Sequence, residues 1–172
     1  HCELKFNIMK VAIMQPYLFP YIGYFQLINA VDVFVVYDDV NYIKQGWINR
    51  NAILVNGVSH QFVMPLKEAS SFKRISESEI NVLLFANWKN RFIKTVIQSY
   101  KKAPFFEEVF ILINQILNYN DKNLSSFLFH SLQLISEYLG ISTKFILSSD
   151  LHISEELKSQ EKVIAICEKL KA

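Results

Sequence analysis

The feature that most constrains the fold is a strand–helix–strand pattern between residues 11 and 36. A short apolar run, Val11–Met14, precedes a turn with two prolines and a helical pattern from about 21 to 30. A second apolar run begins at Val33. Uninterrupted apolar runs joined by one helix are typical of parallel strands covered on both faces, because a parallel pair needs a crossover. The sequence therefore predicts an α/β fold with a Rossmann-like parallel sheet.

The rest of the chain adds a β-hairpin insertion and a helical portion to this sheet. Asn56-Gly57 lies between two apolar runs, which is the strongest short-range hairpin signal. Residues 80–139 repeat apolar side chains at helical spacing. The elements predicted after the first three are hairpin arms at 52–55 and 58–66, a loop at 68–79, helices at about 81–100, 105–117 and 124–139, a strand at 143–147 and a helix at 155–170.

Composition limits the classes of partner. The 172 residues carry a net charge of +2, with the basic residues dispersed, so a nucleic-acid partner is not indicated. No apolar span approaches the length of a transmembrane helix. Two cysteines at opposite ends suggest no disulfide framework, which favours a reducing, cytoplasmic location. A small molecule is the expected partner, and the oligomeric state stays open.

The two ends of the chain carry separate expectations. Residues 1–8 lack the pattern of a signal peptide and are interpreted as a non-native or upstream lead-in. Residues 9–172 are expected to form a single α/β domain. A doubly wound sheet normally returns with another strand after a helix such as 155–170, so we expect this domain to lack a C-terminal part.

Polar and aromatic side chains follow the first two strands where each strand ends. Ligands of open α/β sheets bind beyond the carboxyl ends of the strands, so the loops at 15–20 and 37–41 predict a site. The turn into the first helix also presents free N–H groups, which suit an anion. Alternatively its aromatic side chains belong to the core, and its glycine serves close packing. The substrate-binding candidates here are Gln15, Pro16, Tyr17, Tyr21, Gly23 and Tyr24.

Asp38 and Asp39 are the strongest carboxylate candidates. An aspartate at a strand end can accept a proton, bind Mg²⁺ or hold a sugar hydroxyl. Because adjacent strand residues point to opposite faces, we expect only one of the two to face the site. His152 follows another strand end and is the third catalytic candidate. The alternative for the aspartates is a loop cap or a salt bridge.

Further substrate-binding candidates lie in two loops. Lys44 and Arg50 could hold a phosphate, the arginine through a bidentate fork, and Trp47 could stack on a sugar or base. The alternative is a structured surface loop. The histidines show no metal spacing, so no metal site is predicted. The other candidates in these loops are Asn49, Asn51, Ser149 and Asp150.

Three segments resemble the WbqC-like family of bacterial proteins. They are MQPYLFPYIGYFQLINAVDVFVVYDDVNYIKQGWINRN, YLGISTKFILSSDL and QEKVIAICEKLKA. The resemblance spans nearly all of 9–172, and it implies a chain that continues past Ala172. It also implies a transferase of surface-polysaccharide (O-antigen) biosynthesis. Such an enzyme would attach an acyl or aminoacyl group, for example a glycyl group, to a nucleotide-linked amino sugar. The resemblance implies a sugar-nucleotide or CoA-type donor.

A weaker similarity links residues 20–24 to the nucleotidylyltransferase superfamily. This segment stands where those enzymes carry an H-x-G-H signature, with Tyr21 and Tyr24 in place of the histidines. A neutral tyrosine hydroxyl donates a hydrogen bond but brings no positive charge. Two alternatives to the transferase therefore remain. One is Mg²⁺- and ATP-dependent activation of a small acid, and the other is a non-catalytic binding or scaffold protein with a degenerate site.

Overall fold

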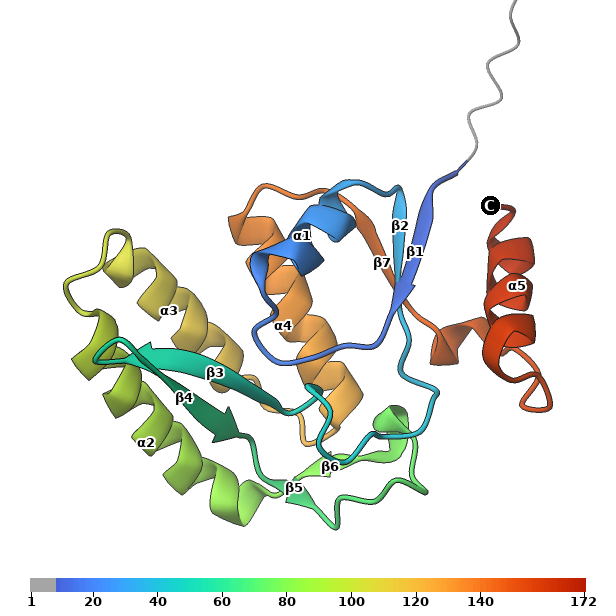
Figure 1. The fold of residues 1–172 in the computed structure, drawn as a ribbon. Coiled ribbons are helices and arrows are strands. Elements are labelled where there is room, and N and C mark those ends of the chain that lie inside the picture. Colours follow the sequence, from blue (N-terminus) through green and yellow to red (C-terminus); the bar gives the residue numbers. More distant parts are fainter. Residues whose placement is uncertain (1–8) are drawn as a thin grey trace, which may run out of the picture.

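A three-stranded parallel sheet lies in the upper right part of the molecule in Figure 1. The computed structural model describes residues 9–172. The strands β1 (Val11–Met14), β2 (Val33–Val36) and β7 (Lys144–Leu147) pair in the order β1-β2-β7. The helix α1 (Ile22–Asn29) connects β1 to β2. The predicted α/β fold with a parallel sheet is therefore confirmed.

Helices cover both faces of this sheet, and every residue of β2 is therefore buried. Phe34 and Val36 face α1 and α4 (Leu124–Tyr138). Val33 and Val35 face the opposite side, where they pack against Ile166 of α5 (Ser159–Leu170). Figure 1 shows α1 and α4 on the left of the sheet and α5 on its right. Strand alternation thus distributes one apolar run between two cores.

The predicted hairpin forms a second layer with the helical portion. The strands β3 (Arg50–Val55) and β4 (Val58–Val63) are antiparallel and join at Asn56-Gly57, where φ is 52° and 77°. Positive φ at both positions is what a type I′ hairpin turn requires. The hairpin packs on α2 (Val82–Tyr100) through Phe62, whose ring lies 4.7 Å from that of Phe92. The helix α3 (Phe106–Leu117) follows α2.

The second hairpin arm is shorter than predicted. It ends at Val63 rather than 66, because Pro65 has no N–H to continue the ladder. The chain instead makes β5 (Leu66–Lys67), which pairs with β6 (Glu79–Ile80). The 3-10 helix η1 (Ile75–Glu77) also lies within the predicted loop at 68–79. The elements β5, β6 and η1 are too short to show a hydrophobic period in the sequence.

The final helix also begins later than predicted. It starts at Ser159 instead of 155, and the 3-10 helix η2 (Ser149–Leu151) precedes it. The Glu155 side chain precedes α5 and bonds Arg74 at 2.8 Å, on a distant loop. The predicted lead-in at 1–8 lies outside the described residues. No helix within residues 9–172 is long and apolar enough to cross a membrane.

Candidate functional site

The carboxyl ends of the three parallel strands meet at one edge of the sheet. Beyond the strands, the Tyr37 N–H donates to Met14 O at 2.8 Å, and the Ser148 N–H donates to Val36 O at 2.9 Å. These bonds place the loops that begin at Gln15, Tyr37 and Ser148 side by side. The juxtaposition expected from the βαβ pattern is therefore present.

The Asp38 carboxylate is the most enclosed polar group at this edge, with 1% of its surface exposed. Its Oδ1 accepts from the Ser149 N–H at 3.0 Å and lies 3.1 Å from Ser148 Oγ. Its Oδ2 accepts from Ser125 Oγ at 2.7 Å and from Ser149 Oγ at 2.9 Å. Three donors from Ser125 and Ser149 bind this carboxylate, so Asp38 joins the loops after β2 and β7 to α4.

The Asp39 carboxylate shares one of these donors and also forms a buried ion pair. Ser148 Oγ contacts Asp39 Oδ1 as well as Asp38. Lys162 Nζ of α5 lies 2.6 Å from Asp39 Oδ2 and donates to Asp39 O at 3.0 Å. Both aspartates therefore contact Ser148, although adjacent strand residues would point to opposite faces. Strand β2 ends at Val36, so the alternation of side chains no longer applies two residues later.

Two residues of this cluster, Ser125 and Lys162, were missed in the sequence. Each has a signal that could have found it. Ser125 lies on the stripe of α4 that also buries Leu128 and Leu132, and Lys162 shares the stripe of α5 with Ile166. A serine or lysine at an apolar helical position predicts a buried polar group with a partner.

The loop after β1 is fixed by tyrosines. The Tyr24 hydroxyl donates to Gln15 O at 2.9 Å, and the Tyr21 N–H donates to the Tyr17 hydroxyl at 3.1 Å. Burial raises the pKa of Tyr24, so this hydroxyl keeps its proton. The Tyr21 ring lies over Gly23, where an added Cβ would come within 2.3 Å of the ring. Gly23 therefore leaves room for an exposed Tyr21.

Two asparagines of the predicted site hold the loops together. The Asn51 side-chain amide donates to Leu18 O at 3.1 Å and to Phe19 O at 2.6 Å. Asn49 is buried, accepts from the Tyr42 hydroxyl at 2.7 Å and donates to a backbone carbonyl. Both amides are thus already engaged within the protein.

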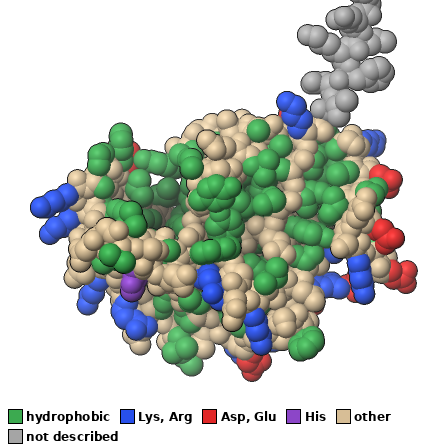
Figure 2. Space-filling model, in the orientation of Figure 1, with side chains coloured by type: hydrophobic (Ala, Val, Ile, Leu, Met, Phe, Trp, Pro, Cys, Tyr) green, Lys and Arg blue, Asp and Glu red, His purple; other side chains and the backbone are tan. Residues whose placement is uncertain are grey.

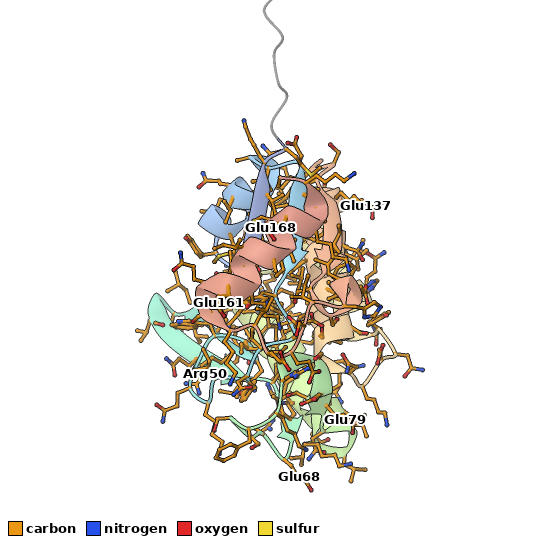
Figure 3. All side chains as sticks on the ribbon, turned by 90° about the vertical axis from the view of Figure 1, so that its right-hand side faces the viewer. Arg50, Glu68, Glu79, Glu137, Glu161 and Glu168 are labelled. Atoms are coloured by element: carbon orange, nitrogen blue, oxygen red, sulfur yellow. The ribbon has the colours of Figure 1, made fainter. Side chains whose placement is uncertain are left out.

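Arg50 differs from these neighbours because its charge is uncompensated. Its Nε is buried without a hydrogen-bond partner, and it makes no ion pair with any of residues 9–172. Figure 3 shows Arg50 low in the view, toward the end of α5 that carries Glu161. A half-buried guanidinium without a counter-charge favours an anionic ligand.

The remaining candidates are less enclosed. Lys44 and Asp150 are exposed, and Trp47 is 55% exposed. His152 is exposed and adopts left-handed backbone geometry, with φ 49°, at the end of η2. Pro16 is buried in the loop after β1. Across residues 9–172, no three His, Cys, Asp or Glu side chains converge as metal ligands.

Comparison with known proteins identifies the family of the chain. The model of the WbqC-like protein family matches residues 15–172. The chain belongs to the WbqC-like family. It is also 32% identical to the uncharacterized protein Rv1507c of Mycobacterium tuberculosis over 165 residues, which cover 95% of this chain and 69% of that protein. No solved structure matches the chain significantly.

The family match includes the whole carboxyl edge of the sheet. It covers the loops after β1, β2 and β7, together with Arg50 and Lys162. The nucleotidylyltransferase similarity has no such support. The Tyr24 hydroxyl, in place of the second signature histidine, is committed to the Gln15 carbonyl.

Proposed function

We propose that this WbqC-like chain is a cytoplasmic transferase of surface-polysaccharide biosynthesis. It attaches an acyl or aminoacyl group to the amine of a nucleotide-linked amino sugar. The observation that carries the proposal is Arg50, a half-buried cation without a counter-charge at the start of β3, where its neighbour Asn51 bonds the loop after β1. Open α/β sheets bind ligands at the carboxyl edge, where this loop lies, and a sugar nucleotide brings the anionic pyrophosphate that Arg50 lacks.

The transfer needs one anion-binding group, one base and one activated donor. Arg50 binds the pyrophosphate, with exposed Lys44 and Trp47 available to close over it. The sugar amine attacks the acyl carbonyl of a thioester. The amine proton passes to the base, the C–S bond breaks, and the thiolate leaves and is then protonated.

The structure favours different roles for the three predicted catalytic residues. Asp38 has its lone pairs filled by serine donors, so we assign it to positioning the loops after β2 and β7. His152 is exposed and able to meet a substrate, so we assign it the base. Asp39 is paired with Lys162 and holds α5 at the site.

Calorimetric titration with a UDP-linked amino sugar tests the proposal. Arg50→Ala removes charge-assisted hydrogen bonds worth about 1.5–3 kcal/mol, so Kd should rise by roughly 10- to 150-fold. Arg91→Ala is the matched control, because Arg91 is exposed on α2 and remote from the sheet edge. Circular dichroism confirms that each variant folds.

Two results would contradict this assignment. One is the absence of binding of UDP-linked or dTDP-linked amino sugars to the unmodified chain. The other is equal affinity of the Arg50→Ala and Arg91→Ala variants. Binding of ATP alone, dependent on Mg²⁺, would instead support activation of a small acid.

A further inference from the structure

A cavity of about 450 Å³ lies between the hairpin and the helical portion. It is bounded by β3, α2, α3 and the end of α4, and by Phe19, Pro20 and Phe25 from the segment after β1. Its volume is within the range of small-molecule sites, roughly 300–1,000 Å³. Figure 2 shows a hollow edged by hydrophobic side chains on the left of the molecule, where these elements meet.

The lining of the cavity is almost entirely apolar. No Asp, Glu, Lys, Arg or His lines it, and its polar members are Asn51, Tyr100 and Tyr138. The Asn51 amide is engaged with two backbone carbonyls, and the Tyr138 hydroxyl faces Glu108 at 3.3 Å. The Tyr100 hydroxyl accepts from the Leu54 N–H at 2.8 Å. Such a lining fits an apolar ligand body and does not fit a phosphate or a sugar.

The cavity borders the loop after β1 and the first residues of β3. Phe19 and Pro20 belong to the loop that follows β1, and Asn51 adjoins Arg50 at the start of β3. From Asn51 the lining continues through Ala52 and Ile53 and reaches Tyr100, which bonds Leu54. Three residues of strand span about 10 Å. A linear apolar chain can therefore extend from the loop after β1 along β3.

We propose that this cavity binds the unbranched hydrocarbon chain of the acyl donor. This inference rests on the proposed transferase function for the place of the acyl carbonyl, which would lie at the Arg50 end. The apolar chain extends along β3 and ends near Tyr100. The donor is thereby a fatty acyl thioester, because an acetyl or glycyl group would leave the apolar volume empty.

Calorimetric titration with acetyl-, butyryl- and octanoyl-CoA tests the donor class. Burial of a methylene is worth about 0.8 kcal/mol, so affinity should increase roughly fourfold for each methylene buried. Ala52→Phe fills the cavity from β3 and should bring octanoyl-CoA binding to the acetyl-CoA level. Ala103→Phe, in the exposed turn before α3, does the same without altering a strand. Ala86→Phe on the exposed face of α2 is the control.

Equal affinities for the three thioesters would overturn the inference. So would chain-length dependence that persists unchanged in both cavity variants. Dimerisation that buries this face and is abolished by Ala103→Phe, with no octanoyl binding, would also overturn it in favour of a second copy.

Titration with sodium octanoate separates this inference from the proposed function. Octanoate tests the cavity without a nucleotide or a thioester, and Ala103→Phe should abolish its binding. Octanoate binding without sugar-nucleotide binding would refute the amino-sugar transferase and retain the cavity as an acyl site. Sugar-nucleotide binding without octanoate binding would refute the acyl site and retain the transferase.

Discussion

Removal of the Lys162 ammonium should destabilise the protein strongly. Lys162→Met retains much of the apolar stem but removes the charge that lies 2.6 Å from Asp39 Oδ2. At an effective dielectric constant of about 20, two unit charges at this separation attract by about 6 kcal/mol. The side chains are only 9% and 10% exposed, so desolvation offsets part of this attraction. Breaking such a pair leaves a buried carboxylate unpaired and costs about 3–5 kcal/mol.

Urea denaturation followed by circular dichroism measures this loss. Heating the protein gives a second measure. For a chain of this size, a loss of about 3–5 kcal/mol in the free energy of unfolding lowers the thermal midpoint by roughly 6–20 °C. The matched control is Lys169→Met, because Lys169 is exposed on the same helix and should change stability by less than about 0.5 kcal/mol.

A double-mutant cycle with Asp39→Asn identifies the partner. The two substitutions should be strongly non-additive, because either one alone breaks the same pair. If Lys162→Met is no more destabilising than Lys169→Met, or if the two effects simply add, the reasoning is refuted. The attachment of α5 would then depend on apolar packing around Ile166 alone.

Two further predictions concern buried polar groups outside this pair. Asn49→Ala should cost about 2–4 kcal/mol in urea denaturation, because it leaves the Tyr42 hydroxyl and the Met64 carbonyl without their partner; a loss below about 0.5 kcal/mol would show that water replaces the amide. His130, which stacks on Tyr119 at 4.0 Å, has its pKa lowered from 6.5 by burial. Its NMR titration should therefore have a midpoint below 6.5. Its stabilising contribution should be complete above the unfolded pKa and be lost as pH falls through the folded pKa, and a midpoint above 6.5 would contradict this.

Much of the fold was predictable because its signals are local. The crossover helix α1 buries Tyr24, Phe25 and Ile28 on the side that helical spacing predicts. The hairpin turn at Asn56-Gly57 follows from the positive φ that both residues tolerate. The segments that were mispredicted, β5, β6 and η1, are two or three residues long and depend on distant partners.

The sequence predicted which loops meet at one edge of the sheet, but not the hydrogen bonds and ion pairs that form there. Topology alone puts the loops after β1 and β2 at one edge, so Asp38 and Asp39 could be selected from the sequence. The sequence could not show that Asp38 is enclosed by serines or that Arg50 lacks a counter-charge. Those facts depend on which side chains arrive from other elements.

The sequence by itself determined the longer strands and helices and their order, because apolar periodicity and turn chemistry act over a few residues. Only the tertiary structure decided the state of each polar group. Asp38 meets Ser125 across 87 positions and Ser148 across 110, and Asp39 meets Lys162 across 123. Contacts at such separations form only when the sheet and its covering helices pack together. Burial in that packed edge makes the pairing obligatory, because an unpaired charge there would be too costly.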